Sequence, residues 1–293
     1  MFDISALYEA TSVQNAVELM QAHPEAALIA GGSDVLIKIR EGKLAGVELI
    51  SIFKLDELRG VSMDDDGTLR ILPLTSFSHI TQHPLIQKYY RVLGEAVDQV
   101  GGPQLRNIGT IGGNICNGVT SADSGSTQVA YDAMLEILGP NGKRTLSIHD
   151  FYKGPGRVAL EPAELLTAIL IPKESYENCY GYYTKYAMRN ALDIATIGCS
   201  VNAVLSPDKK TLERVRNGYG VAGPVPLRAR GAEAALKGKP VSEETLDIAA
   251  KAVQDDVHPR TSWRASEGFR RQIIGETAKR GLRASIERAG GAF

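Results

Sequence analysis

Apolar positions near the start of the chain recur at intervals of three and four residues. Within residues 13–20 this spacing predicts an amphipathic helix that ends near His23 and Pro24. Thr11 followed by Gln14 matches a capping box, which favours a helix start at this point. The first element predicted from the pattern is therefore a helix capped by Thr11.

A continuous apolar run at residues 27–30 predicts a strand, which Gly31 and Gly32 end. Ser33 is a good N-cap for a helix that runs through Ile39. A further strand is expected at residues 48–52. The predicted order in this region is thus strand, glycine turn, helix and strand.

The middle of the chain mixes both kinds of pattern. An acidic turn at residues 64–67 lies between two apolar runs and predicts a hairpin. Helical spacing follows at residues 76–82 and 85–100, and strands return at residues 134–138 and 165–171. Residues 101–114 contain five glycines, and we expect no packed helix there because glycine destabilises helices.

The last third changes pattern again. Three extended runs at residues 182–187, 196–205 and 212–222 predict an antiparallel meander, and Ser242 and Ser266 are expected to cap two closing helices. The sequence therefore predicts an α+β protein with a first domain at residues 1–175, divided into subdomains at about 1–56 and 57–175. A second domain is expected at residues 176–293.

Composition narrows the classes of protein. The 293 residues carry 33 Lys and Arg against 34 Asp and Glu, and this near balance argues against a nucleic-acid partner. The three cysteines form no CxxC pair, which excludes a disulfide framework and a four-thiolate metal site and indicates a reducing, cytoplasmic location. The sequence has no uncharged apolar run of 18 residues, so no membrane span is predicted.

Two glycine loops are the candidates for ligand binding. Residues 30–34 (AGGSD) place backbone amides without β-carbons at a strand-to-helix turn, although for this loop taken alone a purely structural turn is the favoured interpretation. Residues 110–114 (TIGGN) add a hydroxyl and an amide beside paired glycines, donors that suit a diphosphate without adding charge. One dinucleotide with a central diphosphate accounts for both loops at once, its charge balanced by backbone dipoles and not by cationic side chains.

Competing motifs are absent from the sequence. There is no GxGxxG after the first strand, no GxxxxGK followed by Ser or Thr, no HExxH and no GxSxG. The five histidines lie apart without ligand-like spacing, so no metal site is predicted. A Rossmann domain, a P-loop enzyme and a hydrolase are therefore not expected, and no catalytic side chain is assigned.

With both glycine loops, QLRN at residues 104–107 and KYAMR at residues 185–189, the chain resembles the flavoprotein subunits of the molybdenum hydroxylase family nearly end to end. Further matches at residues 120–124 (TSADS), 193–198 (DIATIG) and 260–266 (RTSWRAS) favour the xanthine dehydrogenase branch. The inserted four-cysteine loop of some relatives has no counterpart here. Val100 corresponds to the aromatic residue that stacks on the flavin in the animal enzymes.

The resemblance implies an FAD-binding fold of the vanillyl-alcohol-oxidase type in two subdomains, followed by a C-terminal domain with a three-stranded antiparallel sheet and helices. It assigns the adenosine ribose to Asp123, for which a helix N-cap is the alternative, and the isoalloxazine to Leu165 and Lys185. Lys185 is alternatively a solvated strand residue. The remaining FAD contacts that it implies are Ala27, Leu28, Ile29, Ala30, Gly31, Gly32, Ser33, Asp34, Ile108, Gly109, Thr110, Ile111, Gly112, Gly113 and Asn114.

The resemblance also implies a function. The chain would be the FAD subunit of a heterotrimeric xanthine dehydrogenase of purine catabolism, with molybdopterin and 2Fe-2S clusters on partner subunits and NAD as electron acceptor. Three alternatives stay open: the flavin subunit of a sister enzyme acting on nicotinate, another N-heterocycle or carbon monoxide, a stand-alone flavin reductase, and a non-catalytic nucleotide-binding assembly module.

Overall fold

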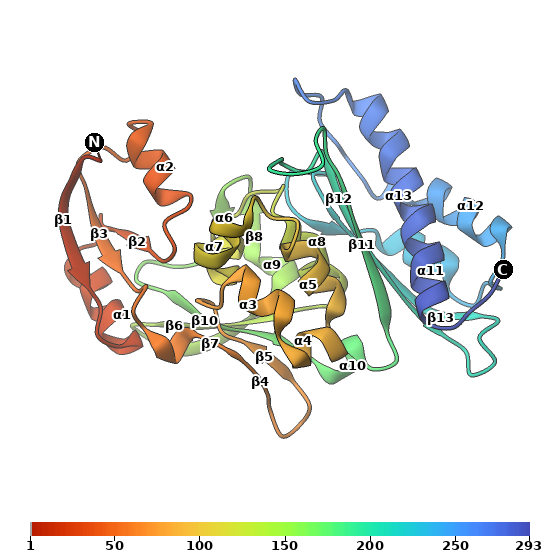
Figure 1. Ribbon diagram of the computed structural model, residues 1–293, viewed down its shortest axis with the longest axis horizontal. Coiled ribbons are helices and arrows are strands. Elements are labelled where there is room, and N and C mark those ends of the chain that lie inside the picture. The colour runs from red at the N-terminus through yellow and green to blue at the C-terminus, as the bar shows by residue number, and fades with distance from the viewer. Residues whose placement is uncertain (1) are drawn as a thin grey trace.

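The computed structural model describes residues 2–293, whose strands form three main sheets along the chain (Figure 1). The first sheet is parallel, with strand order β1–β3–β2, and pairs Leu7 with Leu49 and Leu28 with Ile50. Strand β1 was not predicted because the apolar Leu7 lies on its exposed face and breaks the alternation. The elements are β1 (Ile4–Glu9), α1 (Val13–Ala22), β2 (Ala27–Ile29), α2 (Val35–Arg40) and β3 (Val47–Ser51).

The two helix caps predicted in this region are wrong. Ser12, and not Thr11, caps α1, because its hydroxyl accepts a hydrogen bond of 3.0 Å from the amide of Asn15. Thr11 instead contacts the Asn15 side chain. The N-cap of α2 is Asp34, one residue after Ser33, and its side chain makes no capping hydrogen bond.

The second sheet is antiparallel, with strand order β4–β5–β10–β6–β7, and helices α3, α4, α5 and α8 lie above it in Figure 1. The predicted hairpin at residues 64–67 joins β4 to β5. The elements are η1 (Asp56–Leu58), β4 (Val61–Met63), β5 (Leu69–Ile71), α3 (Phe77–Gln82), α4 (Pro84–Tyr89), α5 (Arg91–Val97), α8 (Asp123–Ala130), β6 (Met134–Gly139), β7 (Gly142–Ser147), α9 (Ile148–Phe151), β8 (Tyr152–Gly154), β9 (Arg157–Val158), β10 (Leu165–Ile171) and α10 (Lys173–Tyr176).

The glycine-rich stretch is helical, contrary to the prediction from its composition. It forms two short helices, α6 (Pro103–Ile108) and α7 (Ile111–Cys116). Pro103 occupies the first turn of α6, where its missing N–H is tolerated. The hydroxyl of Thr110 accepts from the amide of Gly113 at 3.2 Å and so caps α7. Start signals therefore outweigh the low helix propensity of glycine here.

The third sheet is antiparallel, with strand order β11–β12–β13–β14. Its three long strands are those predicted, and the two-residue β14 is added to them. Ser242 and Ser266 cap α12 and α13, as predicted. The elements are β11 (Tyr180–Tyr186), β12 (Ile197–Leu205), β13 (Leu212–Gly220), β14 (Leu227–Arg228), α11 (Arg230–Leu236), α12 (Glu243–Ala252), η2 (Val253–Asp255) and α13 (Glu267–Arg288).

Strand β11 is the edge strand of the third sheet and also packs against the core of the second sheet. Its Tyr183 belongs to the hydrophobic core built on residues 69–176, although β11 is hydrogen-bonded to β12. At the end of α13, Arg288 donates to the carbonyl oxygen of Gly181 at 2.6 Å and to Glu95 of α5 at 2.8 Å. These contacts hold the third sheet against the helices that cover the second sheet.

An ion network joins the same two parts of the chain. Asp132, which has a positive φ of 49°, accepts from His149 at 2.7 Å and pairs with Arg216 at 2.9 Å. It also binds Arg228, which in turn pairs with Glu233 at 2.7 Å. Burial alone would raise the pKa of Asp132, but these cationic and hydrogen-bonding partners hold that pKa well below its ordinary value.

Candidate functional site

A cleft of about 710 Å³ lies between the first and second sheets and is the candidate site. Its size is within the range of about 300–1,000 Å³ that is usual for small-molecule sites. Of the predicted contact residues, those that line it are Leu28, Ala30, Gly31, Gly32, Ser33, Asp34, Thr110, Gly112, Gly113, Asn114, Asp123 and Leu165. The structure thus brings the two glycine loops together, about eighty residues apart in the sequence.

The first loop uses its two glycines for different purposes. A β-carbon at Gly31 would lie 1.9 Å from the carbonyl oxygen of Ile108, so glycine permits the two loops to touch. Gly32 has a φ of 75°, a conformation that other residues rarely adopt. Gly31 is therefore required by a close backbone contact and Gly32 by its backbone conformation. The exposed Ser33 and Asp34 follow them and line the cleft.

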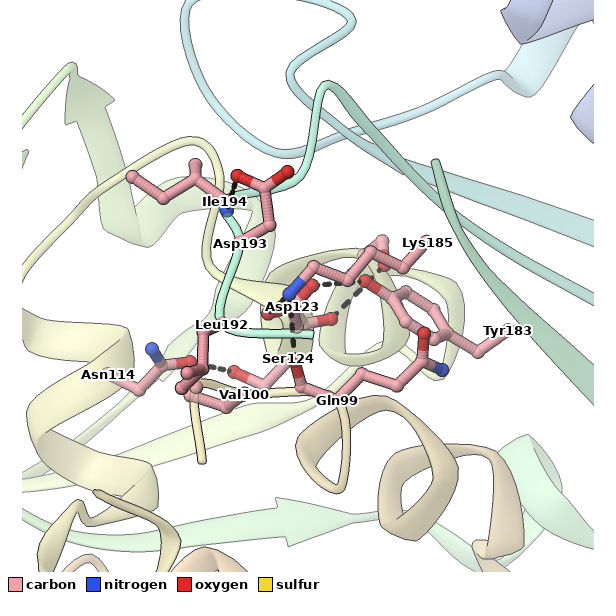
Figure 2. Close-up of polar contacts among 12 residues, drawn as sticks. Gln99, Val100, Asn114, Asp123, Ser124, Tyr183, Lys185, Leu192, Asp193 and Ile194 are labelled. Carbon is pink, nitrogen blue, oxygen red and sulfur yellow. Dashed lines mark hydrogen bonds and ion pairs between the residues drawn. The ribbon is translucent and has the colours of Figure 1, made fainter. Parts of the chain in front are cut away.

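The two glycines of the second loop, Gly112 and Gly113, also have different roles. A β-carbon at Gly112 would meet that of Pro73 at 2.4 Å, so this glycine serves packing. At Gly113 the nearest neighbour would be the hydroxyl of Thr110 at 3.0 Å, and the space beyond is the cleft. Asn114 accepts a hydrogen bond of 2.6 Å from Ser124, which orients its amide (Figure 2). Gly113 is accordingly the glycine that leaves room for a ligand.

Asp123 lies at the start of α8 and is 7% exposed. From β11, Tyr183 donates to it at 2.7 Å and Lys185 at 2.9 Å, as Figure 2 shows. The Lys185 ammonium also donates to the carbonyl oxygen of Gln99 at 2.8 Å. Burial raises the pKa of Asp123, and the nearby charge of Lys185 with both hydrogen bonds opposes that rise.

This arrangement bears on the two roles that the resemblance gave to Asp123 and Lys185. An adenosine ribose and an isoalloxazine lie at opposite ends of an extended FAD, whereas the two side chains are in contact. Lys185 is absent from the cleft lining, and its side chain is 7% exposed. Its position beside Asp123 indicates that it holds this carboxylate in place, while Asp123 keeps free lone pairs toward the cleft.

Six of the predicted residues lie outside the cleft lining. Ile111 is fully buried in the core of the second sheet, and Ile108 is 39% exposed. The carbonyl oxygen of Gly109 accepts from the amide of Phe77. The six residues are Ala27, Ile29, Ile108, Gly109, Ile111 and Lys185. Their assignment as direct FAD contacts stays a prediction.

The cleft also contains residues that the sequence analysis missed. Leu192, Asp193 and Ile194 reach it from the loop after β11, and Leu192 has a positive φ of 53°. Lys38 lines it from α2, one helical turn after Asp34. The four-residue interval from Asp34 could have identified Lys38, since residues so spaced share a helix face. The loop carried only the family match at residues 193–198, which did not place it at the cleft.

The walls suit a ligand with both planar apolar and polar parts. Val100, Leu165 and Leu166 offer apolar surface, whereas the two glycine loops offer amides and hydroxyls. Within residues 2–293, no group of His, Cys, Asp and Glu side chains is arranged to hold a metal ion. None of the described helices is long and apolar enough to cross a membrane. These polar and apolar walls are of the kinds that an FAD molecule needs.

Comparisons with known proteins show the family of the chain. Residues 2–174 match the family described as "FAD binding domain in molybdopterin dehydrogenase", and residues 182–285 match the "CO dehydrogenase flavoprotein C-terminal domain". The chain is 40% identical to the xanthine dehydrogenase FAD-binding subunit of Escherichia coli O157:H7 over 99% of each chain. It is 32% identical to the nicotinate dehydrogenase FAD-subunit of Eubacterium barkeri, over 85% of this chain and 84% of that one.

Among solved structures, carbon monoxide dehydrogenase from Hydrogenophaga pseudoflava matches with a TM-score of 0.92 at 30% identity, covering 98% of this chain and 99% of that one. Fold and cleft together define an oxidoreductase subunit that carries an FAD-binding domain. More particularly, the chain belongs to the FAD-binding subunit family of the molybdopterin dehydrogenases, or molybdenum hydroxylases. The predicted α+β fold class and FAD as the cofactor of this chain are thereby confirmed.

Proposed function

We propose that the chain is the FAD-carrying electron-transfer subunit of a xanthine dehydrogenase complex. The observation that carries the proposal is the meeting of both glycine loops at one cleft in a chain that is 40% identical, end to end, to a xanthine dehydrogenase FAD-binding subunit. Partner subunits with molybdopterin and 2Fe-2S clusters would oxidise the heterocycle and supply electrons. NAD would be the acceptor.

The residues of the cleft divide into holding and positioning roles. The Thr110 hydroxyl and the side-chain amide of Asn114 line the cleft and would donate to a diphosphate, and Gly113, whose own amide donates to the Thr110 hydroxyl, leaves the space for it. Asp123 would accept hydrogen bonds from ribose hydroxyls, and Leu165 would offer apolar surface to the ring system. When bound, FAD supplies the exchange between single-electron and hydride transfer. No side chain of this chain is required as a general acid or base.

Residue Val100 is relevant to the acceptor. It lines the cleft at the position where the animal enzymes of the resemblance have an aromatic residue, so it offers apolar contact without ring stacking.

We propose domain limits near residues 56 and 175, because one sheet ends and the next begins near each of these positions. The cysteines Cys116, Cys179 and Cys199 are free thiols, which supports a reducing, cytoplasmic location.

The first test is the spectrum of the isolated chain. We expect absorption bands of oxidised flavin, and a colourless folded protein would refute the FAD role and favour a nucleotide-binding assembly module. Turnover of a reducible substrate by the isolated chain with NADH would instead favour a stand-alone flavin reductase.

The second test concerns the complex. The chain is expressed with its genomic neighbours, and the purified complex is assayed with xanthine and NAD. Reduction of NAD that depends on xanthine, and that is lost when this chain is omitted, is expected. Identity of 32% to a nicotinate dehydrogenase subunit makes nicotinate the matched alternative substrate. Activity with nicotinate or carbon monoxide but not with xanthine would move the chain to a sister enzyme.

A further inference from the structure

The charged residues that line the cleft are unequal in sign. Within residues 2–293 they comprise four carboxylates, Asp34, Asp123, Glu164 and Asp193, and one cation, Lys38. An FAD diphosphate adds negative charge to such a cleft. Without Lys38, backbone donors alone would have to stabilise the diphosphate against the field of the carboxylates.

Three of these carboxylates are neutralised from outside the lining. Lys185 pairs with Asp123 at 2.9 Å, and Arg144 pairs with Glu164 at 2.6 Å. The Asp193 carboxylate pairs with Arg189 at 3.5 Å and accepts from backbone amides. These three cations are consequently engaged, and none of them lines the cleft. The cation that remains for a ligand is Lys38.

Lys38 itself has no carboxylate partner among the described residues. Its ammonium donates to the side-chain oxygen of Asn117, at the end of α7, at 3.1 Å. The bond spans the cleft from α2 to the helix that carries Gly113. A neutral amide satisfies only one of three ammonium donors and none of the charge.

We infer that Lys38 binds the diphosphate of FAD, so that the negative charge is balanced by one lysine as well as by backbone amides. This inference rests on the proposed FAD role and assigns a residue outside both glycine loops. Lysine is suited to the task because its ammonium acts as a mobile point charge for phosphate. The expectation that cationic side chains play no part is thereby revised.

The test is to titrate the flavin-free protein with FAD at low and at high salt, using the quenching of flavin fluorescence as the measure of binding. Lys38→Met should raise the Kd about tenfold at low salt and should reduce its salt dependence, because one charge-assisted contact is lost. Lys38→Arg should retain most of the affinity. Lys43→Met is the matched control, since Lys43 pairs with Glu41 and does not line the cleft.

Asn117→Leu separates charge balance from a mechanical link between the helices. If Lys38 only ties α2 to Asn117, both variants should weaken FAD binding equally and keep the salt dependence of the wild type. That result, or unchanged binding by Lys38→Met, would overturn the inference. Failure of the wild-type protein to bind FAD at all would refute the proposed function instead.

Discussion

Gly31 and Ile108 are in such close contact that a β-carbon at Gly31 would lie 1.9 Å from the Ile108 carbonyl oxygen. The first glycine loop therefore touches the backbone of the segment that leads directly into the second. The separation of the two loops is fixed before any nucleotide binds, which is the condition for a preorganised site.

We expect Gly31→Ala to push the loops apart. Overpacking of this kind costs about 1–3 kcal/mol in the free energy of unfolding, and it should also raise the Kd for FAD. Thermal denaturation and FAD titration measure the two effects. Gly268→Ala is the control, because an added β-carbon there meets no atom within 4 Å. Unaltered FAD affinity in Gly31→Ala would contradict the role given to the contact.

Gly113→Val should remove FAD while the protein stays folded. The branched side chain projects into the cleft, where its nearest neighbour is only the hydroxyl of Thr110. Gly112→Val should instead lower Tm, because its β-carbon would collide with Pro73. Flavin absorbance per chain and a melting curve distinguish the variants. Full flavin content in Gly113→Val would exclude this loop from the ligand site.

Lys185→Met should destabilise the fold by about 3–5 kcal/mol, since it leaves the buried Asp123 carboxylate without its cation. The pKa of Asp123 would then rise further. A carboxyl group whose folded pKa exceeds its unfolded value of about 3.9 loses stabilising influence as pH rises. Urea denaturation should therefore show the deficit growing from about pH 4 upward.

Adding Asp123→Asn to Lys185→Met should restore part of that stability, because no unpaired charge remains. A purely solvated Lys185, the alternative considered from the sequence, predicts a loss below about 1 kcal/mol and no such recovery.

Asp132→Asn tests the ion network between the second and third sheets. Asparagine tolerates the positive φ of 49°, so the variant removes charge with little backbone strain. We expect a loss of about 2 kcal/mol at pH 7, less than for a fully buried pair because the side chain is 31% exposed. Equal stability of the two proteins at neutral pH would show that the network contributes nothing.

The same network has a defined pH dependence. The pKa of Asp132 is lowered in the folded state, so its stabilisation is complete above the unfolded value of about 3.9 and is lost as pH falls through the folded value. In acid titrations followed by circular dichroism, the wild type should lose more stability below about pH 4 than Asp132→Asn does.

Much of the fold could be predicted from periodicity and capping residues. Ser242 and Ser266 marked helix starts because Ser side chains accept from the first free amides. The same rule misplaced the caps at Thr11 and Ser33, since neighbouring residues compete for one position. The glycine-rich stretch was wrongly excluded from helices, because packing against Pro73 and the cap at Thr110 override propensity.

The site was predictable only where chemistry is local in sequence. The glycine loops are such segments, and each was found. Partnerships across the chain, such as Lys185 with Asp123 or Lys38 with Asn117, depend on tertiary packing and leave no local pattern. Leu192 and its neighbours reach the cleft from a loop without periodicity, so the pattern of apolar positions could not place them there.

Strand β11 supplies Tyr183 to one core and its backbone to another sheet. In a protein truncated at residue 176, the amino-terminal fragment would have a cavity in place of the Tyr183 ring. Its Asp123 would also lose both hydrogen-bond donors, Tyr183 and Lys185. The complementary fragment would present that ring to water. Evolutionary exchange of the C-terminal portion between relatives would for this reason have to carry a matched interface along with it.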